Sequence, residues 1–223
     1  MINYTLIRSN RKTLSLYIKN GIVEARAPLN LSTKEIDKFV HSKEKWIKSK
    51  LSKSIEIKNK RENFKLQYGD KLIYRGKQYP IVAKTGNRAG FENGVFFMPP
   101  DLSSDHIKFT CECVYKILAR YDITQKVQHF SKLMNVKPIA IKINSAKTRW
   151  GSCSTRKTLN FSWRLIIADD DLIDYVIVHE LAHMMQMNHS DKFYDIVEKM
   201  MPDYKSREKR LTDLQKRLVQ EGW

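Results

Sequence analysis

The stretch DDDLIDYVIVHELAHMMQMNHS, residues 169–190, decides how the chain is interpreted. Three carboxylates open it, and negative side chains are stabilised at a helix N-terminus by the helix dipole. A mostly apolar run then leads to His179, and Asn188 breaks the pattern. The stretch therefore predicts a helix, buried over much of its length, that ends among histidines.

Polar side chains stand at informative intervals in this predicted helix. His179 and His183 are four residues apart, so their imidazoles lie on one helix face and can meet at one cation. Glu180 can reach a water on that cation without being a ligand itself. Buried histidine and glutamate on an apolar helix are costly without such a partner. The pattern predicts a catalytic zinc site.

A catalytic zinc needs a third protein ligand and one open position. His189 is the best candidate, because Asn188 supplies a plausible turn that brings it back. Glu198, on the following predicted helix, is the alternative. The metzincin pattern places a histidine at the same spacing but requires glycine where this chain has Gln186, so a true metzincin is not expected.

The expected chemistry is hydrolysis by a metal-activated water. Zinc lowers the pKa of this water to about 7, and Glu180 is the general base that takes its proton during attack on a carbonyl. Glu180 then passes the proton to the leaving amine. Arg149 and Tyr194 are both candidates for holding the oxyanion, and the sequence does not choose between them.

Composition limits the class of protein. The chain has 223 residues, 42% of them hydrophobic, with 8 glycines and 6 prolines, which predicts globular domains. No window approaches the roughly 18 apolar residues of a membrane span. Three cysteines are too few for a disulfide framework. We therefore expect a cytoplasmic protein with no membrane partner.

The net charge of +17 is unevenly distributed. Residues 1–100 carry +13 and residues 101–223 carry +4. Such a field favours DNA or another polyanion as a partner of the basic N-terminal half, although a solvated lysine-rich surface explains it equally well. The substrate itself is expected to be a protein or peptide.

Turn residues divide the first part of the chain into predicted elements. Alternating apolar residues around Asn20 and Gly21 predict a β-hairpin over residues 12–27. Ser32 and Glu35 form a capping box that starts a lysine-rich helix. Short strands separated by glycine turns follow, which completes a β-rich basic region.

Helices and short strands alternate in the rest of the sequence. Residues 104–134 predict a long helix, and residues 139–143 and 159–163 predict strands. We place a boundary near residue 100, between a β-rich N-terminal region with one basic helix, residues 1–100, and a catalytic domain, residues 101–223. The expected fold class is α+β.

Further segments match a known pattern: RWGSC (149–153), LN (159–160), WRL (163–165), DYVIVHELAH (174–183), MNHS (187–190), Phe193 and, less specifically, RKTLS (11–15) and RAP (26–28). Together they resemble the YgjP-like metallopeptidase family, whose distant relatives are the SprT-like and WLM-type proteases. The resemblance implies a zincin-like domain with the active helix beside a small sheet. It also supports His189, which stands in the family's His-Ser-x-x-Phe context. SprT-like relatives act on DNA-bound proteins, an analogy that suits the basic half.

Two other functions stay open on the sequence alone. One keeps the metal but hydrolyses a non-peptide amide or ester, and the other is a nucleic-acid-binding module with a structural metal site. The leading prediction is a zinc-dependent metallopeptidase with one zinc ion, acting on proteins that include DNA-associated ones.

Overall fold

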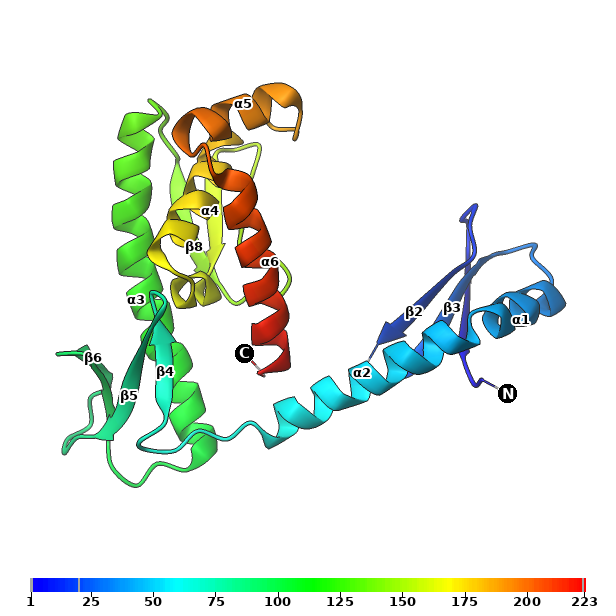
Figure 1. The fold of residues 1–223 in the computed structure, drawn as a ribbon, viewed down its shortest axis with the longest axis horizontal. Helices are drawn as coiled ribbons and strands as arrows, with labels where there is room; N and C mark the ends of the chain where they lie inside the picture. The colour runs from blue at the N-terminus through cyan, green and yellow to red at the C-terminus, as the bar shows by residue number, and fades with distance from the viewer. Residues whose placement is uncertain (1, 20, 222) are drawn as a thin grey trace. The chain divides into compact units, whose positions relative to one another are not determined.

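The computed structural model describes residues 2–19, 21–221 and 223. The described residues form two compact units, one that runs to Phe64 and also includes Gln220 and Glu221, and one that runs from Lys65 to Val219 and includes Trp223. Figure 1 shows the helices and strands of each unit. Within the described part of the chain, no helix is both long enough and apolar enough to cross a membrane.

The first unit combines a three-stranded sheet with two helices. The elements are β1 (Thr5–Ser9), β2 (Ser15–Lys19), β3 (Ile22–Pro28), α1 (Thr33–Ser42) and α2 (Glu44–Asn63). β3 lies in the centre, parallel to β1 and antiparallel to β2. The antiparallel pair of β2 and β3 is the predicted hairpin. Its turn residue Asn20 lies outside the described residues. The predicted basic helix is two helices, because the chain leaves the helical conformation at Lys43.

Alternation along β3 and helical spacing along α1 and α2 build the core of this unit. Its buried residues are Val23, Ala25, Ala27, Ile36, Val40 and Ile47. The predicted capping box is present, since the Ser32 side chain accepts from the backbone of Glu35 and the Glu35 carboxylate accepts from the backbone of Ser32. The cap fixes where α1 begins and thereby which face it buries.

The second unit opens with a four-stranded sheet. Its strands are β4 (Lys71–Tyr74), β5 (Lys77–Ala83), β6 (Gly90–Glu92) and β7 (Val95–Met98), in the order β4-β5-β7-β6. The long helix α3 (Ser104–Leu133) follows at the predicted position. Because β7 packs on α3, these strands belong with the catalytic part, and the boundary that we expected near residue 100 lies instead after Phe64.

A second small sheet and four helical segments complete this unit. They are β8 (Ala140–Asn144), β9 (Gly151–Cys153), β10 (Thr158–Ser162), the 3₁₀ helix η1 (Trp163–Ile167), α4 (Asp170–Ala182), α5 (Asp191–Met200) and α6 (Tyr204–Gln220). The strand order is β8-β10-β9, with β10 parallel to β8 and antiparallel to β9. Helices beside small sheets confirm the predicted α+β class, and α4 contacts β9.

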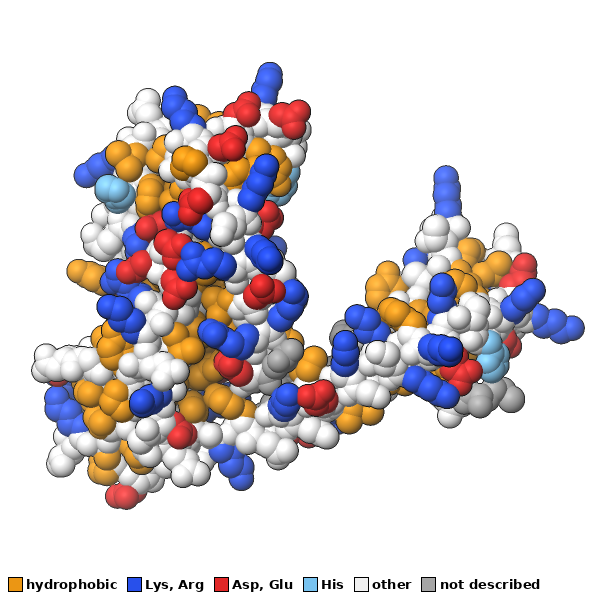
Figure 2. Space-filling model, viewed as in Figure 1, with side chains coloured by type: hydrophobic (Ala, Val, Ile, Leu, Met, Phe, Trp, Pro, Cys, Tyr) orange, Lys and Arg blue, Asp and Glu red, His pale blue; other side chains and the backbone are white. Residues whose placement is uncertain are grey.

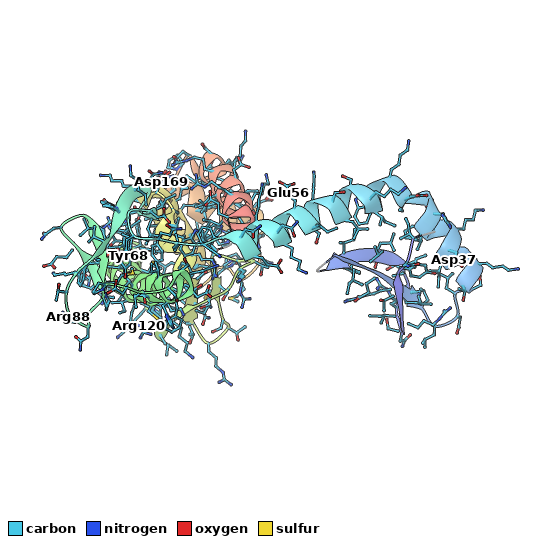
Figure 3. All side chains as sticks on the ribbon, turned by 90° about the horizontal axis from the view of Figure 1, so that it is seen from below. Asp37, Glu56, Tyr68, Arg88, Arg120 and Asp169 are labelled. Atoms are coloured by element: carbon cyan, nitrogen blue, oxygen red, sulfur yellow. The ribbon has the colours of Figure 1, made fainter. Side chains whose placement is uncertain are left out.

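Helix α4, which carries the histidine pair, is buried on most sides and anchored at its start. Asp169 is its N-cap residue and is labelled in Figure 3. Asp170 accepts two hydrogen bonds of 2.7 Å from Arg75 in the β4–β5 turn. Asp174 pairs with Lys126 of α3 at 2.6 Å. Apolar burial holds the helix in the interior, and these ion pairs fix its orientation there.

The core of the first unit predicts the effect of a single truncation. Ile36→Ala removes a fully buried side chain, so we expect local stability to fall by about 2–5 kcal/mol. Hydrogen exchange measured by mass spectrometry on peptides from α1 and β3 reads this loss directly. Lys38→Ala, exposed on the same helix, is the control and should change it by less than about 0.5 kcal/mol. Equal protection in the two variants would contradict this core.

Candidate metal centre

Three imidazoles meet at the C-terminal end of α4. His179 lies in the last turn of the helix, His183 is its C-cap residue, and His189 precedes α5. One nitrogen from each ring lies within 4.8 Å of the others, and the Nε2 atoms of His179 and His189 are 3.1 Å apart. Two zinc-bound nitrogens in a tetrahedral site are about 3.3 Å apart, so the group is close to the spacing that a zinc ion requires.

Neighbouring groups orient the three rings. The His183 Nδ1 lies 3.3 Å from the carbonyl oxygen of Gln186. If Nδ1 carries the proton and donates it to this oxygen, the lone pair of Nε2 is available to a metal ion. The Gln186 amide also donates to Ser190, which ties together the turn that carries His189. The fully buried ring of Phe193 lies against all three imidazoles, with centroids 4.5–4.9 Å away.

The electrostatics of the triad suit a cation. Burial, with the neighbouring His183 and His189 acting in the same direction, lowers the pKa of His179 to about 4. Burial is also the main cause that lowers the pKa of His183. Both rings are therefore neutral at neutral pH, which is the form that binds metal. The donor set fits a borderline-soft divalent ion such as zinc.

Glu180 is buried beside the triad and held by strand β9. Glu180 is only 6% exposed, and this burial is the main cause that raises the pKa of its carboxyl group to about 7. The charge of Arg149 and a hydrogen bond from the backbone of Cys153 act in the opposite direction. A Cβ on Gly151 would lie 2.6 Å from Glu180 Oε1 and 2.7 Å from its Cγ. Glycine at position 151 thus leaves the space that the carboxylate occupies.

A cleft of about 280 Å³ opens next to His179 and Glu180. It is lined by the 149–151 segment and by residues of α6, so Arg149 lies in the same lining as His179 and Glu180. Tyr194 instead lies beside His189, with ring centroids 6.1 Å apart, and is absent from the described lining of the cleft. Glu198 is not in the described group of converging ligand atoms.

Sequence reasoning missed two residues that shape the site. Tyr175 lines the cleft and packs edge-on against His179. Its spacing of four residues before His179 puts both on one helix face, so the signal was present. Gly151 entered the sequence analysis only within the RWGSC segment of the resemblance, because no spacing rule reveals that its missing side chain makes room for Glu180.

A histidine triad that could hold a metal ion, with a buried carboxyl group at its side, is the arrangement expected of a metal-dependent hydrolase. Comparison with protein families gives the particular group. The family described as YgjP-like, metallopeptidase domain, matches residues 12–214. The chain therefore belongs to the YgjP-like family and is a metallopeptidase, a class that implies a bound metal.

Two solved structures share local similarity with the chain. The metallopeptidase zymogen abylysin of Pyrococcus abyssi is 24% identical over 42% of this chain and 95% of its own, with a TM-score of 0.39. The metallopeptidase zymogen jannalysin of Methanocaldococcus jannaschii is 29% identical over 43% of this chain and 96% of its own, with a TM-score of 0.37. No curated protein matches the chain.

The close approach of β9 to Glu180 yields a test. Gly151→Ala forces the carboxylate or the strand to move, so we expect peptidase turnover to fall by about tenfold or more while the metal content is kept. Ser152→Ala changes the next residue of β9, whose side chain points to the other face, and serves as the control. Turnover and metal content should be measured together. Normal turnover in Gly151→Ala would show that this contact does not position Glu180.

Proposed function

We propose that His179, His183 and His189 bind one zinc ion and that Glu180 is the general base for peptide-bond hydrolysis. The observation that carries this proposal is the convergence of three ring nitrogens within 4.8 Å, next to a buried carboxyl group. The metallopeptidase family favours peptide bonds over a non-peptide amide or ester. A purely structural metal would leave the buried position of Glu180 without a role.

The residues divide the work of the reaction. A zinc ion held by the triad supplies Lewis-acid polarisation of the scissile carbonyl and a more acidic water. Glu180 accepts the proton of the attacking water and returns it to the leaving amine. Arg149, in the lining of the same cleft, is the better placed of the two candidate oxyanion partners.

Replacing the general base tests this assignment. Glu180→Gln keeps the size of the side chain but cannot accept the proton, so turnover of a denatured protein should fall by about 10²- to 10⁴-fold. Zinc content should be unchanged, because Glu180 is not a ligand. Glu198→Gln, exposed on α5, is the matched control and should keep its activity. Chelator-sensitive activity that persists in Glu180→Gln would contradict the proposed mechanism.

We further propose that the first unit brings the peptidase to DNA or another polyanion, so that its substrates include DNA-associated proteins. Residues 1–64 carry a net charge of +9. Figure 2 shows Lys and Arg side chains on the visible face of this unit, with fewer acidic ones among them. Lysines spread over a surface act on phosphates through charge and confer no sequence preference.

Salt dependence distinguishes polyanion binding from a merely soluble surface. DNA affinity of the full chain should fall by about tenfold or more between 50 and 200 mM salt if several phosphates are neutralised. The double variant Lys50→Glu and Lys53→Glu, with both sites exposed on α2, should weaken binding and leave cleavage of free protein unchanged. Charge reversal of two exposed lysines in the second unit, Lys71 and Lys77, is the control. Equal DNA binding by all three proteins would remove this part of the proposal.

A further inference from the structure

A groove of about 960 Å³ lies between the C-terminal half of α3 and β8. None of the described residues that line it belongs to the candidate metal centre. β8 is one edge of its sheet, whereas β9, which contacts α4 and holds Glu180, is the other edge. The groove is therefore separate from the catalytic cleft.

The groove runs along the open edge of a strand. Ala140 and Ile141, the first two residues of β8, line it together with Ile139 just before the strand, although neighbouring residues of a strand point to opposite faces. Because Ala140 and Ile141 point to opposite faces of the strand, a cleft that touches both lies at its edge. β8 pairs with β10 on one side, and no described strand pairs with the other side. Backbone groups along such an edge can accept an added strand.

Large apolar side chains are exposed at this groove. Ile139 is 75% exposed and Tyr121, on α3, is 67% exposed. Ile117, one turn before Tyr121 on the same helix, is also 67% exposed and extends the apolar surface. Exposed apolar surface of this kind marks an interaction site, and tyrosine is among the residues that contribute most to binding.

The charge of the lining indicates the occupant. Arg120, Lys132 and Lys137 line the groove, whereas its described lining contains no Asp or Glu. Arg120 lies on α3, where Figure 3 labels it. A second copy of the chain brings a net charge of +17 and would be repelled. An acidic segment is attracted by the same three cations.

We propose that this α3–β8 groove is a docking site for an extended acidic segment of a partner protein. The segment adds to the free edge of β8 through backbone hydrogen bonds. Its alternate apolar side chains contact Tyr121 and Ile139, and its carboxylates face Arg120, Lys132 and Lys137. Docking needs no metal, so a failure of the docking proposal leaves the peptidase mechanism standing. A failure of the peptidase mechanism likewise leaves the docking proposal standing.

Fluorescence anisotropy with designed peptides tests the docking. The probe is a peptide of about ten residues that alternates valine with aspartate. One comparison peptide replaces every aspartate with lysine. A second keeps the sequence but carries N-methyl groups at alternate backbone nitrogens, which removes strand pairing without altering charge. We expect the first peptide to bind the full chain and the other two to bind at least about tenfold more weakly.

Variants locate the binding to the groove. Ile139→Asp should weaken the first peptide by about tenfold or more, because it places a like charge at an apolar contact. Lys137→Glu should weaken it and improve the lysine peptide. Phe109→Asp is the matched control, since Phe109 is 67% exposed on the same helix but is not in the described lining of the groove.

Three results would overturn the proposal. They are no binding of the aspartate peptide, equal binding of the N-methylated peptide, and equal effects of Ile139→Asp and Phe109→Asp. Sedimentation gives one further outcome. A concentration-dependent dimer that Ile139→Asp abolishes would identify a second copy of the chain as the occupant and would also overturn the acidic partner.

Discussion

The contact between Glu180 and strand β9 is the constraint on which the site depends. A carboxyl group 6% exposed needs a partner in the interior, and the backbone of Cys153 supplies a hydrogen bond while Gly151 supplies the room. This contact fixes α4 against the small sheet. The same helix then presents His179 and His183 on one face, so the position of the carboxyl group and that of the imidazoles are set together.

The remainder of the second unit holds this contact in place. Its interior includes an aromatic cluster, in which Tyr115 stacks on Trp163 at 5.4 Å and Trp223 meets both rings edge-on. η1 is buried throughout and leads directly into α4. The ligands of the site are therefore held in two different ways. Ion pairs and apolar packing hold α4, which carries His179 and His183, whereas the short turn around Gln186 holds His189.

Sequence patterns anticipated the parts of the structure that local periodicity encodes. The α4 histidine pair, the long helix α3, the hairpin and the Ser32 cap all follow from spacings within a few residues. The boundary after Phe64 did not, because it depends on β7 packing on α3, a contact between segments. The role of Gly151 could not be predicted for the same reason, because it depends on the contact with Glu180, a residue distant in the sequence.

Metal analysis of the native chain beside His189→Ala tests the central claim most directly. Protein purified without chelator should contain about one zinc per chain, because three imidazoles complete a catalytic donor set. His189→Ala retains only the pair on α4 and should lose most of its zinc during dialysis, with its fold unchanged by circular dichroism. Equal zinc in the two proteins would contradict the account, because His189 would then be no ligand.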